Sequence, residues 1–321
     1  MTVEALIFKW HVSPGIMRAM QKSHQAQNTL SMSELLEFLD LKPAATELPE
    51  TSAWIGTPQT VPSDRVYGGL QLAQAIVAAG KTVPADQSIL TLQADFIGGV
   101  PTDGPLTWHV EHVADTPTFS TRRSSIMVNG RELFTALTRW GQTRSDLPSY
   151  SHTTPQPVTV SPEELPSLYD RYHDDDRIPL WWRITRPVNA HPVAEPPYVT
   201  PVEQGTTQTT MLHPTGQVPA DPVIQAALAG YATDMSILEP AFRASGALRH
   251  APKSRILTLT HALTFHQMPT WDSWLQFDAY LESLSNGRAL GTGELFDLDG
   301  THLVSASQVG FVKFGVFDGT D

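Results

Sequence analysis

The chain carries one pattern twice, and this repeat limits the folds that it can adopt. In each copy an alanine-rich run of helical character precedes about four strand-like segments, first over 70–140 and again over 222–314. Strands that follow one another through tight turns favour antiparallel pairing, and a helix beside them gives an α+β layout. The sequence therefore predicts two units, each with one long helix wrapped by an antiparallel sheet.

The two copies can be aligned through short matching segments. Asn129-Gly130 is a strong hairpin signal, and Asp221-Pro222 is a good helix start because an N-cap acceptor precedes proline. We interpret the helix that begins there as running to Leu238. The aligned pairs are Leu90-Thr91-Leu92 with Leu257-Thr258-Leu259, Asn129-Gly130 with Asp299-Gly300, and Leu72-Ala73 with Leu228-Ala229.

Four regions are expected along the chain. Residues 1–31 have no persistent period, so we interpret them as a flexible N-terminal extension. Residues 32–142 and 221–321 form the two repeated units, the second of which carries the candidate chemistry. Residues 143–220 contain about half of the 26 prolines and cannot form one regular element. Because 178–182 is apolar, we expect this stretch to be a crossover that packs on a unit.

Composition excludes several classes of function. A net charge of -12 argues against a nucleic-acid or anionic-membrane partner, which would require a cationic surface. The absence of cysteine excludes disulfides, thiolate metal sites and cysteine nucleophiles. No apolar run approaches the roughly 18 residues that span a bilayer, and no secretory signal pattern is present. We therefore expect a cytoplasmic protein with no membrane span.

Asp234 is the only charged residue between Pro222 and Leu238. Helical spacing places it on the face of Gly230 and Ala227, small residues that let a sheet approach closely. A buried carboxylate is costly unless it is paired or hydrogen-bonded. The pattern allows two interpretations, a functional acid or a carboxylate near the helix end that points to water.

Gln308 interrupts an apolar row in the last strand. Val304, Ala306, Gly310, Val312 and Phe314 share its face by the period of two. Its amide needs partners for two donors and an acceptor, so it is either a satisfied core glutamine or part of a site. Its counterpart in the first copy is Thr138.

Thr258 lies in the first strand of the second copy and alternates with Ile256, Thr260 and Ala262. A strand threonine alone is commonly just a good β-former. In the alignment of the two copies, Thr258 falls on Thr91 and Asp234 falls on Ala78. Only the second copy can therefore assemble a carboxylate, a hydroxyl and an amide.

An ordered set of short motifs carries a resemblance to a known family. With these motifs the chain resembles, from about residue 32 to residue 314, the type II acyl-CoA thioesterases, which have a double hotdog fold. The motifs are Arg65-Val66-Tyr67-Gly68-Gly69-Leu70, Phe119-Ser120-Thr121-Arg122-Arg123, Arg186-Pro187-Val188, Gly230-Tyr231-Ala232-Thr233-Asp234, Phe265-His266 and Ser307-Gln308-Val309-Gly310. The resemblance implies a tandem hotdog that hydrolyses fatty acyl-CoA to fatty acid and coenzyme A.

The resemblance also implies roles for single residues. The family's catalytic carboxylate, hydroxyl and amide fall on Asp234, Thr258 and Gln308. A thiolate leaving group, whose parent thiol has a pKa of about 8.5, needs no strong general acid. We expect the three side chains to hold and activate a water. The oxyanion would meet a backbone N–H at Gly68 or Gly69, because glycine permits close approach.

Four positions depart from the family pattern and bear on substrate preference rather than on the chemistry. Met211 and His213 stand where an aromatic residue and an arginine are common, and Gln93 stands in a strand that usually contains histidine. Thr260 replaces a common acidic residue after the catalytic hydroxyl.

Coenzyme A is anionic, so an acidic protein must offer it a local cationic patch. The candidates for this contact are Arg122, Arg123 and Arg288, with Arg131 and Lys313 nearby in the matching strands. Each is equally well explained as an ordinary solvated charge. No further cofactor and no metal are expected, and the resemblance implies a homo-oligomer.

Other functions fit less well. A hotdog protein that only binds acyl-CoA would not need Asp234, Thr258 and Gln308. A hotdog hydratase would need a histidine close after Asp234, but the next histidine in the sequence is His250. No Gly-x-Ser-x-Gly elbow is present for a seryl hydrolase. His173 beside Asp174-Asp175-Asp176 is interpreted as a solvated acidic loop. His261 and His266 face opposite sides of one strand by their odd spacing, so a metal site is rejected.

Overall fold

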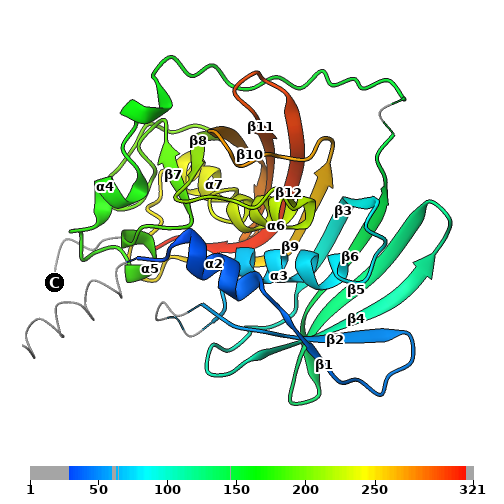
Figure 1. The fold of residues 1–321 in the computed structure, drawn as a ribbon. Helices are drawn as coiled ribbons and strands as arrows, with labels where there is room; N and C mark the ends of the chain where they lie inside the picture. The colour runs from blue at the N-terminus through cyan, green and yellow to red at the C-terminus, as the bar shows by residue number, and fades with distance from the viewer. Residues whose placement is uncertain (1–28, 60–62, 64, 145, 316–321) are drawn as a thin grey trace, which may run out of the picture.

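A computed structural model describes residues 29–59, 63, 65–144 and 146–315 as an α+β structure with a single large antiparallel sheet (Figure 1). The sheet has twelve strands in the order β1-β2-β4-β5-β6-β3-β9-β12-β11-β10-β8-β7. The first six in the chain are Lys42–Ala44, Thr51–Gly56, Gln87–Phe96, Leu106–Asp115, Phe119–Val128 and Arg131–Gln142. The remaining six are Val188–Pro192, Thr207–Pro214, Arg255–Phe265, Leu275–Ser285, Arg288–Phe296 and His302–Lys313.

The strand order shows two equivalent halves joined at the middle of the sheet. β3 and β9, the first strand after the long helix in each half, pair with one another antiparallel. Outward from this seam, β6, β5, β4 and β2 on one side occupy the places of β12, β11, β10 and β8 on the other. The predicted repeat of one helix and about four antiparallel strands is therefore confirmed.

Two helices of small residues, α3 (Gly68–Gly80) and α6 (Pro222–Thr233), pack against each other and supply much of the core. Almost all of their side chains are buried. Glycine allows the close approach, because a Cβ at Gly69 would lie 2.4 Å from the Tyr231 carbonyl oxygen. The Tyr67 hydroxyl donates to that same oxygen at 2.9 Å. The start of α3 is thus fixed against the end of α6.

The second helix is shorter than predicted. It ends at Thr233, Asp234 is its C-cap, and α7 (Glu239–Ser245) begins after a turn. The predicted continuation to Leu238 is wrong because the chain leaves the helix where Asp234 meets the start of α3. The observed turn places the carboxylate at a helix end and not on a helix face.

At the N-terminal end, residues 1–28 of the predicted extension lie outside the described residues. The last residues of that extension belong to the folded unit. Leu30 is buried in the core, and Ser31 is the N-cap of α2 (Met32–Leu39) in a capping box with Glu34. The folded chain therefore begins before the predicted boundary.

The proline-rich stretch packs on the fold and also adds to it. It contains the 3-10 turn η1 (Pro162–Glu164), the short helices α4 (Leu168–Tyr172) and α5 (Leu180–Arg183), and the edge strands β7 and β8. β8 pairs with β10, so this stretch extends the second half of the sheet. Arg186 is buried with its guanidinium 5.0 and 4.6 Å from the Trp181 and Trp182 rings. Within the described ranges, no helix has the length and apolar character needed to cross a membrane.

Candidate active site

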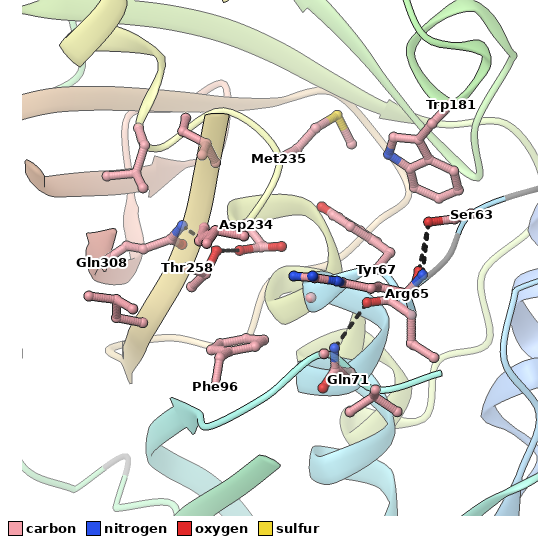
Figure 2. A pocket seen from close by; sticks show the side chains of 18 of the residues that line it. Ser63, Arg65, Tyr67, Gln71, Phe96, Trp181, Asp234, Met235, Thr258 and Gln308 are labelled. Carbon is pink, nitrogen blue, oxygen red and sulfur yellow. Dashed lines mark hydrogen bonds between the residues drawn. The ribbon is translucent and has the colours of Figure 1, made fainter. Parts of the chain in front are cut away.

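A cavity of about 550 Å³ lies between the first turn of α3, the end of α6 and the strands β9 and β12. Both halves of the molecule line it. Figure 2 shows Asp234, Thr258 and Gln308 pointing toward one another on one side of this cavity. Much of the remaining wall is apolar, from Phe96, Ile97, Met235, Leu238, Ile256, Leu257 and Leu259. The three residues that the sequence marked are therefore brought together, from one helix end and two neighbouring strands.

The start of α3 is built to receive the Asp234 carboxylate. α3 has no side-chain N-cap, so the N–H groups of its first two residues, Gly68 and Gly69, can bind acceptors outside the helix. The Gly69 N–H donates to Asp234. A Cβ at Gly68 would lie 2.6 Å from Asp234 Oδ2, so only glycine leaves room for the carboxylate. The positive end of the helix dipole also favours the anion at this point.

Burial raises the pKa of Asp234 to about 6. Hydrogen bonds from Thr258, from the Gly69 backbone and from Gln308, together with the charge of Arg249, favour the ionised form and limit the rise. Asp234 is therefore mostly ionised at neutral pH, yet basic enough to accept a proton. A pKa close to the working pH is what an efficient general base needs.

Thr258 and Gln308 form a hydrogen-bonded row that ends on the carboxylate. The Gln308 amide donates to Thr258 Oγ1 at 3.0 Å, and the Thr258 hydroxyl donates to Asp234 Oδ1 at 3.3 Å. On its other side, Gln308 Oε1 lies 2.5 Å from His261 Nδ1. Gln308 shares the buried face of β12 that alternation predicts, and its amide is satisfied within the site.

His261 reaches this row because β9 contains a bulge. The register pairs Gly310 with Thr258 and Val309 with Thr260, so Leu259 is an extra residue. Beyond it the alternation shifts by one, and His261 and Thr258 both contact the same side of the sheet. The predicted alternation of Thr258 with Thr260 and Ala262 is wrong for this reason. Simple counting gave no sign that His261 belongs to the site.

The two glycines predicted to bind an oxyanion lie beside the carboxylate. Gly69 already donates to Asp234, which leaves its N–H committed while the carboxylate is ionised. Gly68 lines the cavity, and as the first residue of α3 its N–H has no intrahelical acceptor. The oxyanion role of either glycine stays a prediction, and Gly68 is better placed for it.

The expectation that Arg122 contacts coenzyme A is wrong. Its side chain is 2 % exposed, and its guanidinium donates to the Thr82 hydroxyl, to the Asp115 carboxylate and to the backbone carbonyls of Thr82, Ala114 and Thr121. These partners satisfy the guanidinium and tie β5 to the end of α3. Alternation places Arg122 on the inward face of β5 with Ser120, Ser124 and Ile126, but it does not show the partners that hold the side chain there, which come from β4 and from the turn after α3.

The other predicted cations are exposed but do not line the cavity. Arg123 pairs with Glu111 at 2.7 Å, and Arg288, Arg131 and Lys313 lie at exposed strand positions. Their contact with coenzyme A stays a prediction. Two cations that were not predicted to make this contact, Arg65 and Arg249, do line the cavity. Both lie in irregular segments, where no periodic pattern distinguishes an inward-facing side chain.

Glu239 and its neighbours form a second polar group on the cavity wall, also unmarked in the sequence. Glu239 is 3 % exposed, and burial raises its pKa to about 7. It accepts a hydrogen bond from the Tyr198 hydroxyl at 2.5 Å, and Arg249, Arg186 and Arg243 favour its charged form. Both acids accept hydrogen bonds from protein groups, but Glu239 is buried whereas Asp234 is partly exposed on the cavity wall.

No group of three or more metal-ligating side chains is found in the part of the chain that the structure describes. His173 contacts Asp174 at 3.1 Å on the exposed surface. His261 is buried, while His266 is exposed and bonded to Ser305.

Comparison with known proteins identifies the family. The model of the acyl-CoA thioesterase N-terminal domain matches residues 57–141, and that of the C-terminal domain matches residues 162–312. Acyl-coenzyme A thioesterase 8 of Mus musculus is 25% identical over 276 residues, which cover 81% of this chain and 82% of the relative.

Solved structures show the same fold. Acyl-CoA thioesterase II from Mycobacterium marinum superposes with a TM-score of 0.68 at 22% identity, over 87% of this chain and 98% of that one. A hot dog fold protein from Alicyclobacillus acidocaldarius gives 0.67 at 17% identity, over 88% and 98%. The fold is therefore the hotdog fold, and the two family domains together match most of the described chain. The chain belongs to the type II acyl-CoA thioesterase family and is an enzyme that hydrolyses thioesters.

Proposed function

We propose that the chain hydrolyses fatty acyl-CoA to free fatty acid and coenzyme A, with Asp234, Thr258 and Gln308 as its catalytic residues. One observation carries this proposal: an accessible carboxylate at the open start of α3 ends a hydrogen-bonded row from Gln308 through Thr258. Burial holds the pKa of this carboxylate at about 6, where it is ionised at neutral pH and still basic.

In the proposed reaction Asp234 orients a water and accepts its proton as the water oxygen bonds to the thioester carbonyl carbon. The carbonyl oxygen becomes an oxyanion and accepts a hydrogen bond from Gly68 N–H. When the oxyanion collapses, the carbon–sulfur bond breaks and the coenzyme A thiolate leaves. Asp234 then returns its proton to the thiolate or to solvent. No covalent enzyme intermediate is required, so positioning and preorganised donors account for the rate.

The shape and polarity of the cavity support a fatty acyl group. Leu257, Leu259 and Ile97 are among the more exposed apolar side chains of the described residues, and all three line the cavity. An alkyl chain lying against them would remove apolar surface from water on both partners. The extent of this apolar wall sets the preferred acyl chain length, which is measured by comparing the hydrolysis of acyl-CoA substrates of different lengths.

The tandem, double hotdog arrangement supports a single site at this end of the helix pair. α3 of the first unit would supply the backbone donors, and the end of α6 with β9 and β12 of the second unit would supply the side chains. Neither unit has both sets. Assembly into a homo-oligomer remains a prediction from the family, as does contact of Arg123 and Arg288 with coenzyme A.

A thiol-release assay with a long-chain acyl-CoA tests the assignment. Asp234→Asn is expected to lower kcat by about 10²–10⁴-fold, because the amide cannot accept the proton. Asp278→Asn is the matched control, since Asp278 is also a buried carboxylate, on β10, but lies outside the cavity and is held by Thr209, Gln276 and the Gln156 N–H. It should retain kcat within a few-fold. Full turnover by folded Asp234→Asn would exclude Asp234 as the base.

A further inference from the structure

His261 is a buried titratable residue that the proposed mechanism leaves without a role. Its side chain is 1 % exposed, between β12 and the end of α6. Nδ1 lies 2.5 Å from Gln308 Oε1, and Nε2 lies 3.2 Å from the Thr233 hydroxyl. Both ring nitrogens therefore have one polar neighbour each, and one of these neighbours is a proposed catalytic residue.

The number of protons in this row restricts how it can be arranged. Burial lowers the pKa of His261 to about 4, so the ring is neutral at working pH and carries one proton. If Nδ1 carries it, Gln308 Oε1 accepts, and Nε2 accepts from the Thr233 hydroxyl, which then no longer donates to the Ala229 carbonyl 2.9 Å away. The Gln308 NH₂ group then faces Thr258 at 3.0 Å and can only donate. Thr258 must accept this bond, and its own proton is left for Asp234 Oδ1 at 3.3 Å.

We propose that His261 is a positioning residue, which fixes the Gln308 amide so that the Thr258 hydroxyl donates to Asp234. The row runs in one direction, from Thr233 through His261, Gln308 and Thr258 to the carboxylate. This inference rests on the proposed function, because it assigns a purpose to the orientation of two residues of the catalytic set.

The opposite arrangement would leave Asp234 without the hydrogen bond from Thr258. With the proton on Nε2, the ring would donate to Thr233, whose hydroxyl would donate to the Ala229 carbonyl at 2.9 Å. Nδ1 would then accept from a flipped Gln308 amide, and Gln308 Oε1 would take the Thr258 proton. Thr258 would have none to give to ionised Asp234. The two arrangements differ in the His261 tautomer and in which of the two Gln308 amide atoms, oxygen or nitrogen, faces His261.

The charges around the two ends of the row are few. From the segment after α7 Arg249 faces Asp234, and from the start of α3 the hydroxyl of Tyr67 faces it, while Glu239 lies farther along the same wall. Among the described residues no charged side chain perturbs His261, whose pKa is affected only by burial and by Gln308. A change at His261 should therefore reach Asp234 through Gln308 and Thr258.

Kinetics of three variants test this. His261→Phe removes the donor at similar volume and should lower kcat about 10–100-fold with KM within about twofold, since misorientation affects the reacting groups more than binding. It should also move the midpoint of the kcat–pH profile upward, because Asp234 loses a hydrogen bond to its ionised form. His261→Asn, whose amide nitrogen replaces Nδ1, should recover part of both. His266→Phe, at an exposed position just after the end of β9, is the control and should change neither.

A second measurement needs no destabilised variant. In ¹⁵N spectra of the labelled wild-type enzyme, the His261 signals, identified by their loss in His261→Asn, should show a proton on Nδ1.

A double variant gives a third test. In a Gln308→Ala background, adding His261→Phe should lower kcat no further, because both substitutions interrupt the same hydrogen-bonded row. An Nε2–H tautomer, additive losses, or an unchanged pH midpoint in His261→Phe would overturn the inference. Active Asp234→Asn would instead overturn the proposed function, whatever His261 does.

Discussion

The two halves of the sheet occupy equivalent places but differ in the side chains they turn toward the helices. β3 and β9 each contain a bulge, at Leu90 and Leu259. Cross-strand register around these bulges aligns Ile89 with Thr258, Leu92 with His261, Thr138 with Gln308 and Trp140 with Gly310. The sequence alignment of Thr91 with Thr258 is therefore wrong, whereas that of Thr138 with Gln308 is confirmed. Polar residues in the second half stand where the first half is largely apolar.

The N-terminal ends of the two long helices, α3 and α6, also differ between the halves. α6 begins with Asp221, whose carboxylate accepts from the Val223 N–H at 2.8 Å, and with Pro222, which has no N–H. α3 begins with two glycines and no side-chain cap. Of these two helices, only α3 therefore begins with backbone N–H groups that no side chain caps, and its start lies beside the polar residues of the second half. The comparison shows that the repeat determines the fold, whereas the candidate site depends on a few positions at one end of the helix pair.

The strongest test of this comparison gives the second half the first-half residues. In the triple variant Thr258→Ile, His261→Leu and Gln308→Thr, we expect kcat to fall by about 10²–10³-fold, because Asp234 remains but its side-chain donors are replaced. The fold should be retained, since the same residue types occupy the equivalent places in the first half. Kinetics and a thermal melt on one preparation measure both. A folded triple variant with near wild-type turnover would contradict the division of roles.

A smaller effect comes from pH. Burial raises the pKa of Asp234 from 3.8 to about 6, and the proposed base must be ionised. We therefore expect kcat to be level above about pH 7 and to fall about tenfold per unit well below pH 6. The pH profile of kcat is measured at saturating acyl-CoA. Recovery of activity on return to neutral pH shows that the acid exposure has not unfolded the protein irreversibly. A midpoint near 4 would mean that Asp234 is solvated in the working enzyme and that burial does not set its basicity.

Much of this organisation is readable from the sequence, because period and turn chemistry decide it. The eight strands of the two repeats and the inward face of Gln308 follow from alternation. Asp234 was recognisable as the one charge in an apolar run. Asn129-Gly130 forms its predicted tight turn with both residues at positive φ.

What the sequence did not reveal depends on irregular backbone. A bulge at Leu259 has no residue signature, yet it decides that His261 shares a side with Thr258. The early end of α6 depends on the approach of α3, a contact between segments far apart in the chain. The role of Arg122 depends on Asp115 and Thr82, which reach it only in the folded sheet. In each case a tertiary contact overrides a local period.

The smallest predicted effect is on stability: removing the Asp234 charge should stabilise the fold although it lowers activity. Because the folded-state pKa of Asp234 is raised above 3.8, the folded protein binds this proton more tightly than the unfolded chain does. Stability is therefore lost as pH rises from about 4 to 6, and the ionised carboxylate costs on the order of 1–3 kcal/mol at neutral pH. Asp234→Asn removes that charge and should raise Tm by about 2–4 °C while it lowers kcat.

The first half provides the comparison, because Ala78, the sequence counterpart of Asp234, is an uncharged residue on a fully buried helix. Its position carries no such cost. The gain in Tm should shrink as the pH is lowered toward 4, where Asp234 is protonated in the wild-type fold as well. Paired thermal melts of the wild type and Asp234→Asn across this range measure it. A gain that stays constant with pH would show that the substitution acts through packing, and a loss of Tm at neutral pH would show that the donors from Gly69 and Thr258 more than offset the cost of burying the charge.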